Sequence, residues 1–167
     1  MRLEDRIASF YEEYRSQLFR YLLSLGLAVQ DAEEVIQETF IRLYMHLRAE
    51  GAESNLRAWS YRVSHNLAVN LLRSGRRVVT VEPEQWEQIS ETVSDVSPGP
   101  EELVLNKERM LRVESTMNDL TTLQRECVRL RAEGLRYREI AEILGVTTAS
   151  VSSSLRNAVG RLLKEGL

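Results

Sequence analysis

The chain has 167 residues, of which 43% are hydrophobic and 28% charged, a composition typical of a folded protein and not of a disordered or fibrous one. No apolar run approaches the ~20 residues of a membrane span, and the charged, amphipathic residues 1–14 are not expected to be a signal peptide. The single cysteine, Cys127, excludes an internal disulfide and favours the cytoplasm; in an apolar-periodic helix it is expected to be buried.

The net charge of −3 is unevenly distributed along the chain. Residues 1–76 are balanced, with 10 basic and 10 acidic residues, whereas residues 77–106 carry 1 basic and 7 acidic residues. Residues 107–167 carry 11 basic and 8 acidic residues. A mildly basic C-terminal part on its own predicts weak, salt-sensitive binding to DNA.

The first two predicted helices are amphipathic. Apolar residues recur at three- and four-residue steps over residues 4–26, and a second helix is predicted to begin at Asp31, because Asp31 and Glu34 have capping-box spacing. Its inward stripe is Ala32, Ile36, Phe40, Leu43 and Leu47. Acidic residues in a first turn complement the helix dipole, so we expect no metal site there.

A third helix is predicted over residues 56–74, after a short loop. Trp59, Val63, Leu67 and Leu71 form its predicted inward stripe. Basic residues lie along it, with Tyr61 and Asn66 between them, a pattern suited to single-stranded nucleic acid. For Trp59 core packing is favoured; for Tyr61 base stacking and a partly buried surface ring remain equal alternatives.

Residues 78–105 contain all three prolines and most of the acidic excess, which predicts a linker. A helix is expected to start at about Glu101 and to lead into three short helices, predicted over residues 121–132, over residues 137–144 and from about Thr148. Glycine just past an apolar-periodic run is typical of a helix end.

The spacing within residues 137–163 predicts a helix-turn-helix, whose second helix enters the DNA major groove. Its predicted core is Ile140, Ala141, Gly145, Val151 and Leu155. The side of the second helix away from that core carries hydroxyl, amide and guanidinium groups, which suit phosphate and base-edge contacts. An ordinary helical hairpin is the alternative interpretation.

Two helical units, an acidic linker and a C-terminal helix-turn-helix, in this order, resemble the extracytoplasmic-function sigma factors of bacterial RNA polymerase. DAEEVIQETFIRLY, residues 31–44, is similar to their core-binding helix, and RAWSYRVSHNLAVNLLR, residues 57–73, to their promoter-melting helix. Residues 120–163 resemble sigma region 4. The resemblance implies an all-α fold with a region 2-like domain at 1–77, a linker at 78–105 and a region 4-like domain at 106–167.

The resemblance also implies roles for particular residues. Contacts to the core polymerase would come from Asp31, Glu34, Gln37, Glu38 and Arg42. Contacts to the −10 element would come from Gly51, Ala52, Glu53, Ser54, Asn55, Leu56, Tyr61, Arg62, Asn66, Arg73 and Arg76. Contacts to the −35 element would come from Thr147, Thr148, Ser152, Ser153, Arg156 and Asn157.

The implied partners are the clamp coiled coil and flap of the polymerase core, promoter DNA, and, as in many family members, an anti-sigma factor. No cofactor, metal, membrane insertion or enzymatic activity is expected. Family members often carry basic residues where Ser152, Ser154 and Asn157 stand, so promoter choice is expected to depend more on the −10 element or on duplex shape. The alternatives are a stand-alone helix-turn-helix regulator and a nucleic-acid-processing enzyme, for which no catalytic constellation is present.

Overall fold

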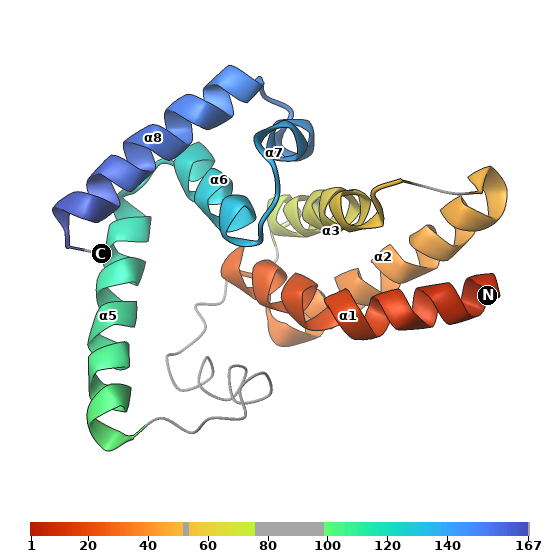
Figure 1. Ribbon diagram of the computed structural model, residues 1–167, viewed down its shortest axis with the longest axis horizontal. Helices are drawn as coiled ribbons and strands as arrows, with labels where there is room; N and C mark the ends of the chain where they lie inside the picture. Colours follow the sequence, from red (N-terminus) through yellow and green to blue (C-terminus); the bar gives the residue numbers. More distant parts are fainter. Residues whose placement is uncertain (52–53, 76–98, 167) are drawn as a thin grey trace. The chain divides into compact units, whose positions relative to one another are not determined.

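The computed structural model describes residues 1–51, 54–75 and 99–166, and within them the regular elements are helices (Figure 1). The chain divides into two units, Met1–Thr80 and Val81–Leu167. The all-α prediction is confirmed. Most of the predicted linker, residues 78–98, lies outside the described residues. No helix in the described ranges is long and apolar enough to cross a membrane.

In the part of the first unit that the structure describes, there are three helices: α1 (Leu3–Ser24), α2 (Val29–Glu50) and α3 (Leu56–Arg73). Each of them contacts the other two. The predicted inward stripe of α2 is confirmed, since all five of its side chains are buried, against Leu18, Tyr21 and Leu22 of α1. The predicted start of α2 is wrong: the helix begins at Val29, and Asp31 lies in its first turn and not at the N-cap.

The predicted inward stripe of α3 is also wrong. Trp59, Val63, Leu67 and Leu71 are only half-buried. The buried face is instead formed by residues that are either small or polar, namely Ser60, Tyr61, Ser64, His65 and Ala68. Small side chains such as serine and alanine allow helices to pack closely. On this face the Ser64 hydroxyl and Nδ1 of His65 are hydrogen-bonded, whereas Ser60 Oγ is buried with no partner among the described residues.

The described residues of the second unit form four helices: α5 (Pro100–Asp119), α6 (Thr122–Ala132), α7 (Tyr137–Leu144) and α8 (Thr148–Lys164). The bounds of the last three agree with the sequence-based expectation. Thr121 caps α6 through a reciprocal pair, in which its hydroxyl accepts from the Gln124 N–H at 3.2 Å and the Gln124 side chain accepts from the Thr121 N–H at 3.1 Å. This capping box stabilises the start of the helix by satisfying two orphan donors.

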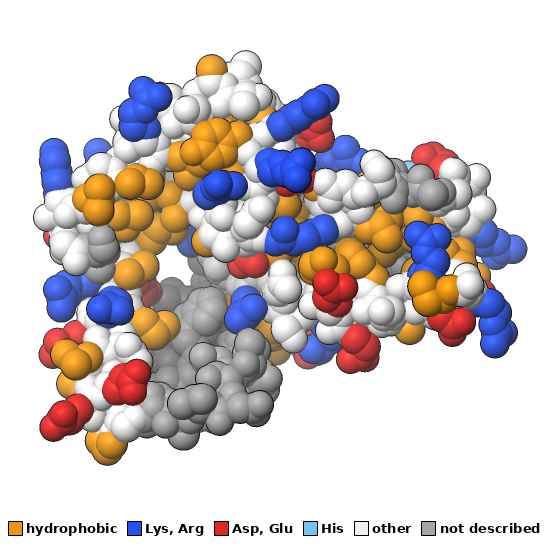
Figure 2. All heavy atoms as spheres, in the orientation of Figure 1, with side chains coloured by type: hydrophobic (Ala, Val, Ile, Leu, Met, Phe, Trp, Pro, Cys, Tyr) orange, Lys and Arg blue, Asp and Glu red, His pale blue; other side chains and the backbone are white. Residues whose placement is uncertain are grey.

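Helix α5 begins at Pro100, a favourable residue for a first helical position. The predicted helix start at about Glu101 is confirmed to within one residue, so the last residues of the segment 78–105 are helical. Much of α5 is exposed, including Val104, Leu105, Met110 and Leu111. Figure 2 shows such hydrophobic side chains at the surface along this helix.

Candidate polymerase and nucleic-acid interfaces

The outward side of α2, here called the α2 outer face, brings together the residues predicted to bind the polymerase core. Glu34, Gln37 and Arg42 are exposed, while Asp31 and Glu38 are half-buried. The Arg42 guanidinium donates to the Glu38 carboxylate over 2.7 Å, which holds both side chains along the helix. An exposed pair of this kind adds little stability, but it presents a fixed arrangement of charge to a partner.

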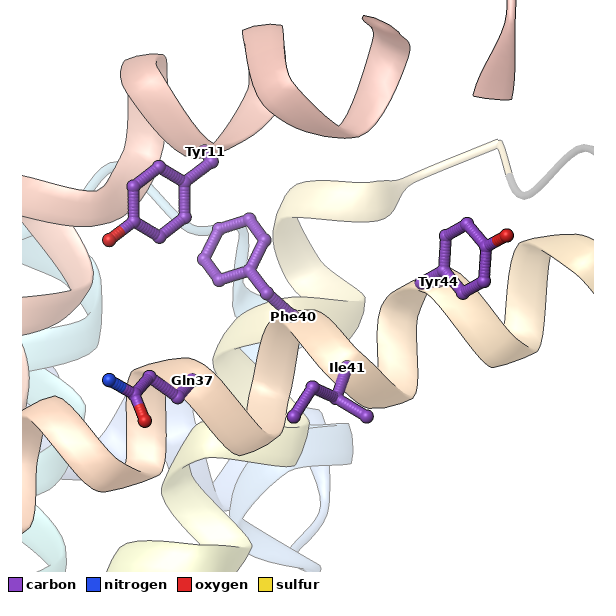
Figure 3. Close-up of a pocket in the computed structure, with 5 residues that line it drawn as sticks. All are labelled: Tyr11, Gln37, Phe40, Ile41 and Tyr44. Carbon is purple, nitrogen blue, oxygen red and sulfur yellow. The ribbon is translucent and has the colours of Figure 1, made fainter. Parts of the chain in front are cut away.

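Apolar side chains lie among these charges. Ile41 is 55% exposed and Met45 63% exposed. A shallow groove of about 450 Å³ is lined by Tyr11 of α1 and by Gln37, Phe40, Ile41 and Tyr44 of α2. In Figure 3 the rings of Tyr11 and Phe40 lie close to each other on one side of it; their centroids are 4.8 Å apart, edge to face. Apolar anchors with a charged rim are the usual anatomy of a protein-binding surface.

The loop between α2 and α3 is fixed at both ends. Gly51 ends α2 with a φ of +83°, which an L side chain rarely adopts. Asn55 caps α3, its side-chain oxygen accepting from the Ala58 N–H at 3.1 Å. Ser54 and Asn55 are exposed and Leu56 is half-buried, whereas Ala52 and Glu53 lie outside the described residues.

One side of α3 carries the polar residues predicted to meet the −10 element. Arg62, Asn66 and Arg73 are exposed and recur at intervals of four and seven residues, so they lie along one stripe of the helix. Arg76 lies outside the described residues. A stripe of guanidinium and amide groups can contact successive phosphates or bases of an extended strand.

Tyr61 must be removed from this set, because its ring is fully buried. It packs edge to face on Tyr21 at 5.3 Å, a contact worth about 0.5–1.5 kcal/mol beyond burial. The Tyr21 hydroxyl shares a 2.7 Å hydrogen bond with Nδ1 of His65. Burial lowers the pKa of His65 to about 4, so the imidazole is neutral at pH 7 and supplies no positive charge to a nucleic-acid surface.

The helix-turn-helix is formed as expected. Gly145 ends α7 at a φ of +66° and a ψ of 35°, the left-handed conformation that the turn requires. The Val146 N–H then bonds to the Ala141 carbonyl at 3.1 Å. Ile140, Ala141, Val151 and Leu155 are all buried, so the predicted helix-turn-helix core holds together α7 and α8.

The exposed face of α8, here called the α8 polar face, contains the predicted −35 residues. Thr148, Ser153, Arg156 and Asn157 are exposed and Ser152 is half-buried. Thr147 is exposed and caps the helix, its hydroxyl accepting from the Ser150 N–H at 3.1 Å. Ser154 is buried beside Cys127 and cannot read a base; Cys127 is buried as expected, and burial raises the pKa of its thiol.

Two basic residues at the start of α7 were missed by sequence reasoning. Arg136 and Arg138 are exposed on either side of Tyr137, and Figure 2 shows Lys and Arg side chains spread over the surface of this unit. The first helix of a helix-turn-helix crosses the DNA backbone, so its N-terminal arginines suit phosphates. Their position directly before the helix-turn-helix core was the signal that could have found them.

Comparison with known proteins finds a family match in each of the two units. Residues 10–78 match the sigma-70 region 2 family, and residues 110–162 match the sigma-70 region 4 family. The chain is 27% identical over 162 residues to the RNA polymerase sigma factor YlaC of Bacillus subtilis, covering 95% of this chain and 90% of that protein. It is 33% identical over 135 residues to the ECF RNA polymerase sigma-E factor of Salmonella typhimurium, covering 77% of this chain and 70% of that protein.

Solved structures share the fold. CnrH, solved in complex with the cytosolic domain of CnrY, superposes with a TM-score of 0.64 at 21% identity, over 96% of this chain and 87% of that one. The sigma factor RpoE of Bartonella quintana, solved with the anti-sigma factor NepR, gives 0.61 at 20% identity, over 94% and 96%. With both sigma regions matched in order, the stand-alone regulator is not favoured: the chain belongs to the extracytoplasmic-function group of the sigma-70 family, the initiation factors that bind core RNA polymerase and direct it to promoters.

Proposed function

We propose that the α2 outer face is the surface by which this sigma factor binds core polymerase. Ile41 and Met45 supply exposed apolar area, and the groove beside Gln37 can accept a side chain of the partner. The ion pair of Glu38 and Arg42 borders that area. The partner surface is then a helical element with apolar anchors and complementary charges, such as the clamp coiled coil.

The −10 element meets the first unit at the α2–α3 loop and the polar stripe of α3. Extruding a base from the duplex costs a few kcal/mol, which contacts to the freed base and strand must offset. Ser54 and Asn55 can hydrogen-bond a base edge, while Arg62, Asn66 and Arg73 follow the strand. Tyr61 takes no part, because it is buried.

The −35 element meets the α8 polar face, and this face is the observation that carries the assignment for the second unit. Behind the turn at Gly145, α8 buries Val151 and Leu155 while exposing Ser153, Arg156 and Asn157. Arg156 is the strongest candidate for a base contact, since guanidinium groups bind guanine bidentately. Arg136 and Arg138 add phosphate contacts.

The protein carries out no reaction of its own and works in the bacterial cytoplasm, where RNA polymerase transcribes. Residues 1–77 and 106–167 act as separate DNA-binding modules, joined by the acidic segment 78–105. An anti-sigma factor is a further partner, proposed because a chain of the same fold, RpoE of Bartonella quintana, was solved bound to the anti-sigma factor NepR.

The test of core binding is a charge change on the α2 outer face. Replacing Gln37→Lys together with Glu38→Lys is expected to weaken binding to core polymerase by about 100-fold or more, since it buries like or unpaired charge in an interface. Binding is measured with purified core and labelled protein. Glu12→Lys with Ser16→Lys makes the same change in net charge at exposed positions of α1 and should bind normally; equal loss in both variants would contradict the proposed face.

The test of promoter recognition is Arg156→Ala. It is expected to lower the preference for the −35 element by about 1–3 kcal/mol, while melting of a promoter that lacks that element is unchanged. Open complexes are counted by permanganate footprinting of the holoenzyme. Lys164→Ala removes an exposed charge near the end of the same helix and serves as the control. Equal losses on promoters with and without the −35 element would show that Arg156 does not read it.

A further inference from the structure

Two rings stack where α2 ends and α3 begins. The imidazole of His46 and the indole of Trp59 lie 5.0 Å apart between centroids, with 19° between their planes. The His46 side chain is 19% exposed, and its Nδ1 lies 3.5 Å from the Glu50 carboxylate. The sequence predicted Trp59 to belong to the core, but it is half-buried, and its stacking partner is this histidine.

Each ring is tied by the backbone to one end of the loop. His46 precedes Leu47, whose carbonyl accepts from the Gly51 N–H at 3.1 Å. The Trp59 N–H donates to the Asn55 carbonyl at 3.1 Å. The stack therefore spans the loop, with one ring a helical turn before it and the other a helical turn after it. While the rings stay stacked, the end of α2 before Gly51 and the start of α3 after Asn55 are held close together.

We propose that the His46–Trp59 stack is a positioning device, which holds the two ends of the α2–α3 loop at the spacing needed to accept the extruded base of the −10 element. This inference rests on the proposed function of the loop. One face of each ring is occupied by the other ring, and the role proposed for the pair is to act through the loop and not as a platform for that base. Recognition groups must be held within about 0.5 Å to be selective, and aromatic pairs supply such rigidity.

The test uses the full chain assembled with bacterial core polymerase and a promoter library randomised over the −10 and −35 elements. Transcripts are sequenced, and enrichment is calculated for each promoter position. Trp59→Leu and His46→Leu are expected to lower the preference at the −10 position read by the loop by about fivefold, the low end of what one recognised base pair contributes. The preference at −35 positions and the affinity for core should be unchanged.

Three further variants separate positioning from general stability. Trp59→Phe keeps a ring for His46 and should restore most of the preference. Val63→Ala removes half-buried apolar surface from the next turn of α3 without touching the stack, and it should lower no single −10 position. The double variant His46→Leu with Trp59→Leu should lose no more than either single variant, because both remove the same interaction.

The failures are distinguishable. If the unaltered chain fails to bind core or enriches no −10 sequence, the proposed function is wrong, and this inference falls with it. If the unaltered chain selects a −10 sequence and Trp59→Leu selects it equally well, the positioning role alone is overturned. A uniform fall over all −10 and −35 positions in Trp59→Leu, matched by Val63→Ala, would also overturn it, since that pattern indicates a purely structural side chain.

Discussion

Helices α3 and α8 are both proposed to meet promoter DNA, yet they are built in opposite ways. Helix α8 buries an apolar stripe, with Val151, Leu155 and Ala158 inside and hydroxyl, amide and guanidinium groups outside. Helix α3 buries Ser64, His65 and other small or polar side chains, and leaves its larger apolar residues half-exposed.

The difference lies in what each helix packs against. In α8 most of the apolar residues fill the space that α6 and α7 leave, so burial largely follows hydropathy, with buried Ser154 and exposed Val159 as exceptions. In α3 close approach to α1 and α2 selects small residues, and specificity comes from the hydrogen bond between His65 and Tyr21. An interior of this kind depends on satisfied polar groups and tolerates little extra volume.

The largest expected difference in stability is between alanine variants of Leu155 in α8 and Leu67 in α3, because sequence periodicity places each leucine on an apolar stripe of its helix. Leu155→Ala in α8 should destabilise the second unit by about 3 kcal/mol, because Leu155 is 5% exposed and its removal leaves a cavity. Leu67→Ala in α3 should cost the first unit only about 1 kcal/mol, since Leu67 is half-buried. Hydrogen exchange measured by mass spectrometry reports each unit separately. Equal losses of stability in the two variants would contradict the proposed difference in packing between α3 and α8.

A second pair of substitutions adds volume to each helix instead of removing it, and here the larger loss of stability is expected in α3. Ser64→Leu adds volume to the buried face of α3, where the Ser64 hydroxyl donates to the Tyr61 carbonyl, and should cost about 2 kcal/mol. Ser153→Leu on the exposed side of α8 should change stability by less than about 0.5 kcal/mol. The same exchange measurement applies. A stable Ser64→Leu variant would mean that α3 can shift away from α1 and α2, contrary to close packing.

These two helices also show how much could be predicted from sequence. The bounds of α6, α7 and α8 followed from an apolar period of 3.6 residues and from glycines at helix ends, and the inward stripe of α2 followed in the same way. The buried face of α3 could not be found by that method, because Ser60 and Ser64 score as polar although both are buried. The periodicity of a helix shows which of its faces is apolar. It does not show how closely a neighbouring helix packs against each face.

In the candidate surfaces, too, some features could be predicted from the sequence and others could not. Exposure of Arg62, Asn66, Arg156 and Asn157 was predictable from helical periodicity. The burial of Tyr61 was not, because an aromatic ring suits either a core or a base. The apolar part of the α2 outer face, Ile41 and Met45, was missed as a site because the sequence directed attention to the charged residues around it.

The smallest expected effect concerns pH and is confined to the first unit. His65 has a folded-state pKa of about 4, lowered from 6.5 by burial. Below pH 6.5 His65 binds a proton in the unfolded chain but stays neutral in the folded chain. The contribution of His65 to stability is therefore fully present above pH 6.5 and is lost progressively toward pH 4. From about pH 7 to about pH 5.5 the loss should be about 1 kcal/mol.

The variant His65→Gln carries no titratable ring and isolates this contribution. It should be less stable than the unaltered chain at pH 7, because it disturbs the bond to Tyr21, but the part of the pH dependence due to His65 should vanish. Proton NMR provides the direct check: the chain has 2 histidines, so His46→Gln assigns the His65 resonance, which should stay neutral at pH 5.5. A resonance that titrates near 6.5 would mean that water reaches the imidazole, and that the polar interior of α3 is open where the apolar interior of α8 is closed.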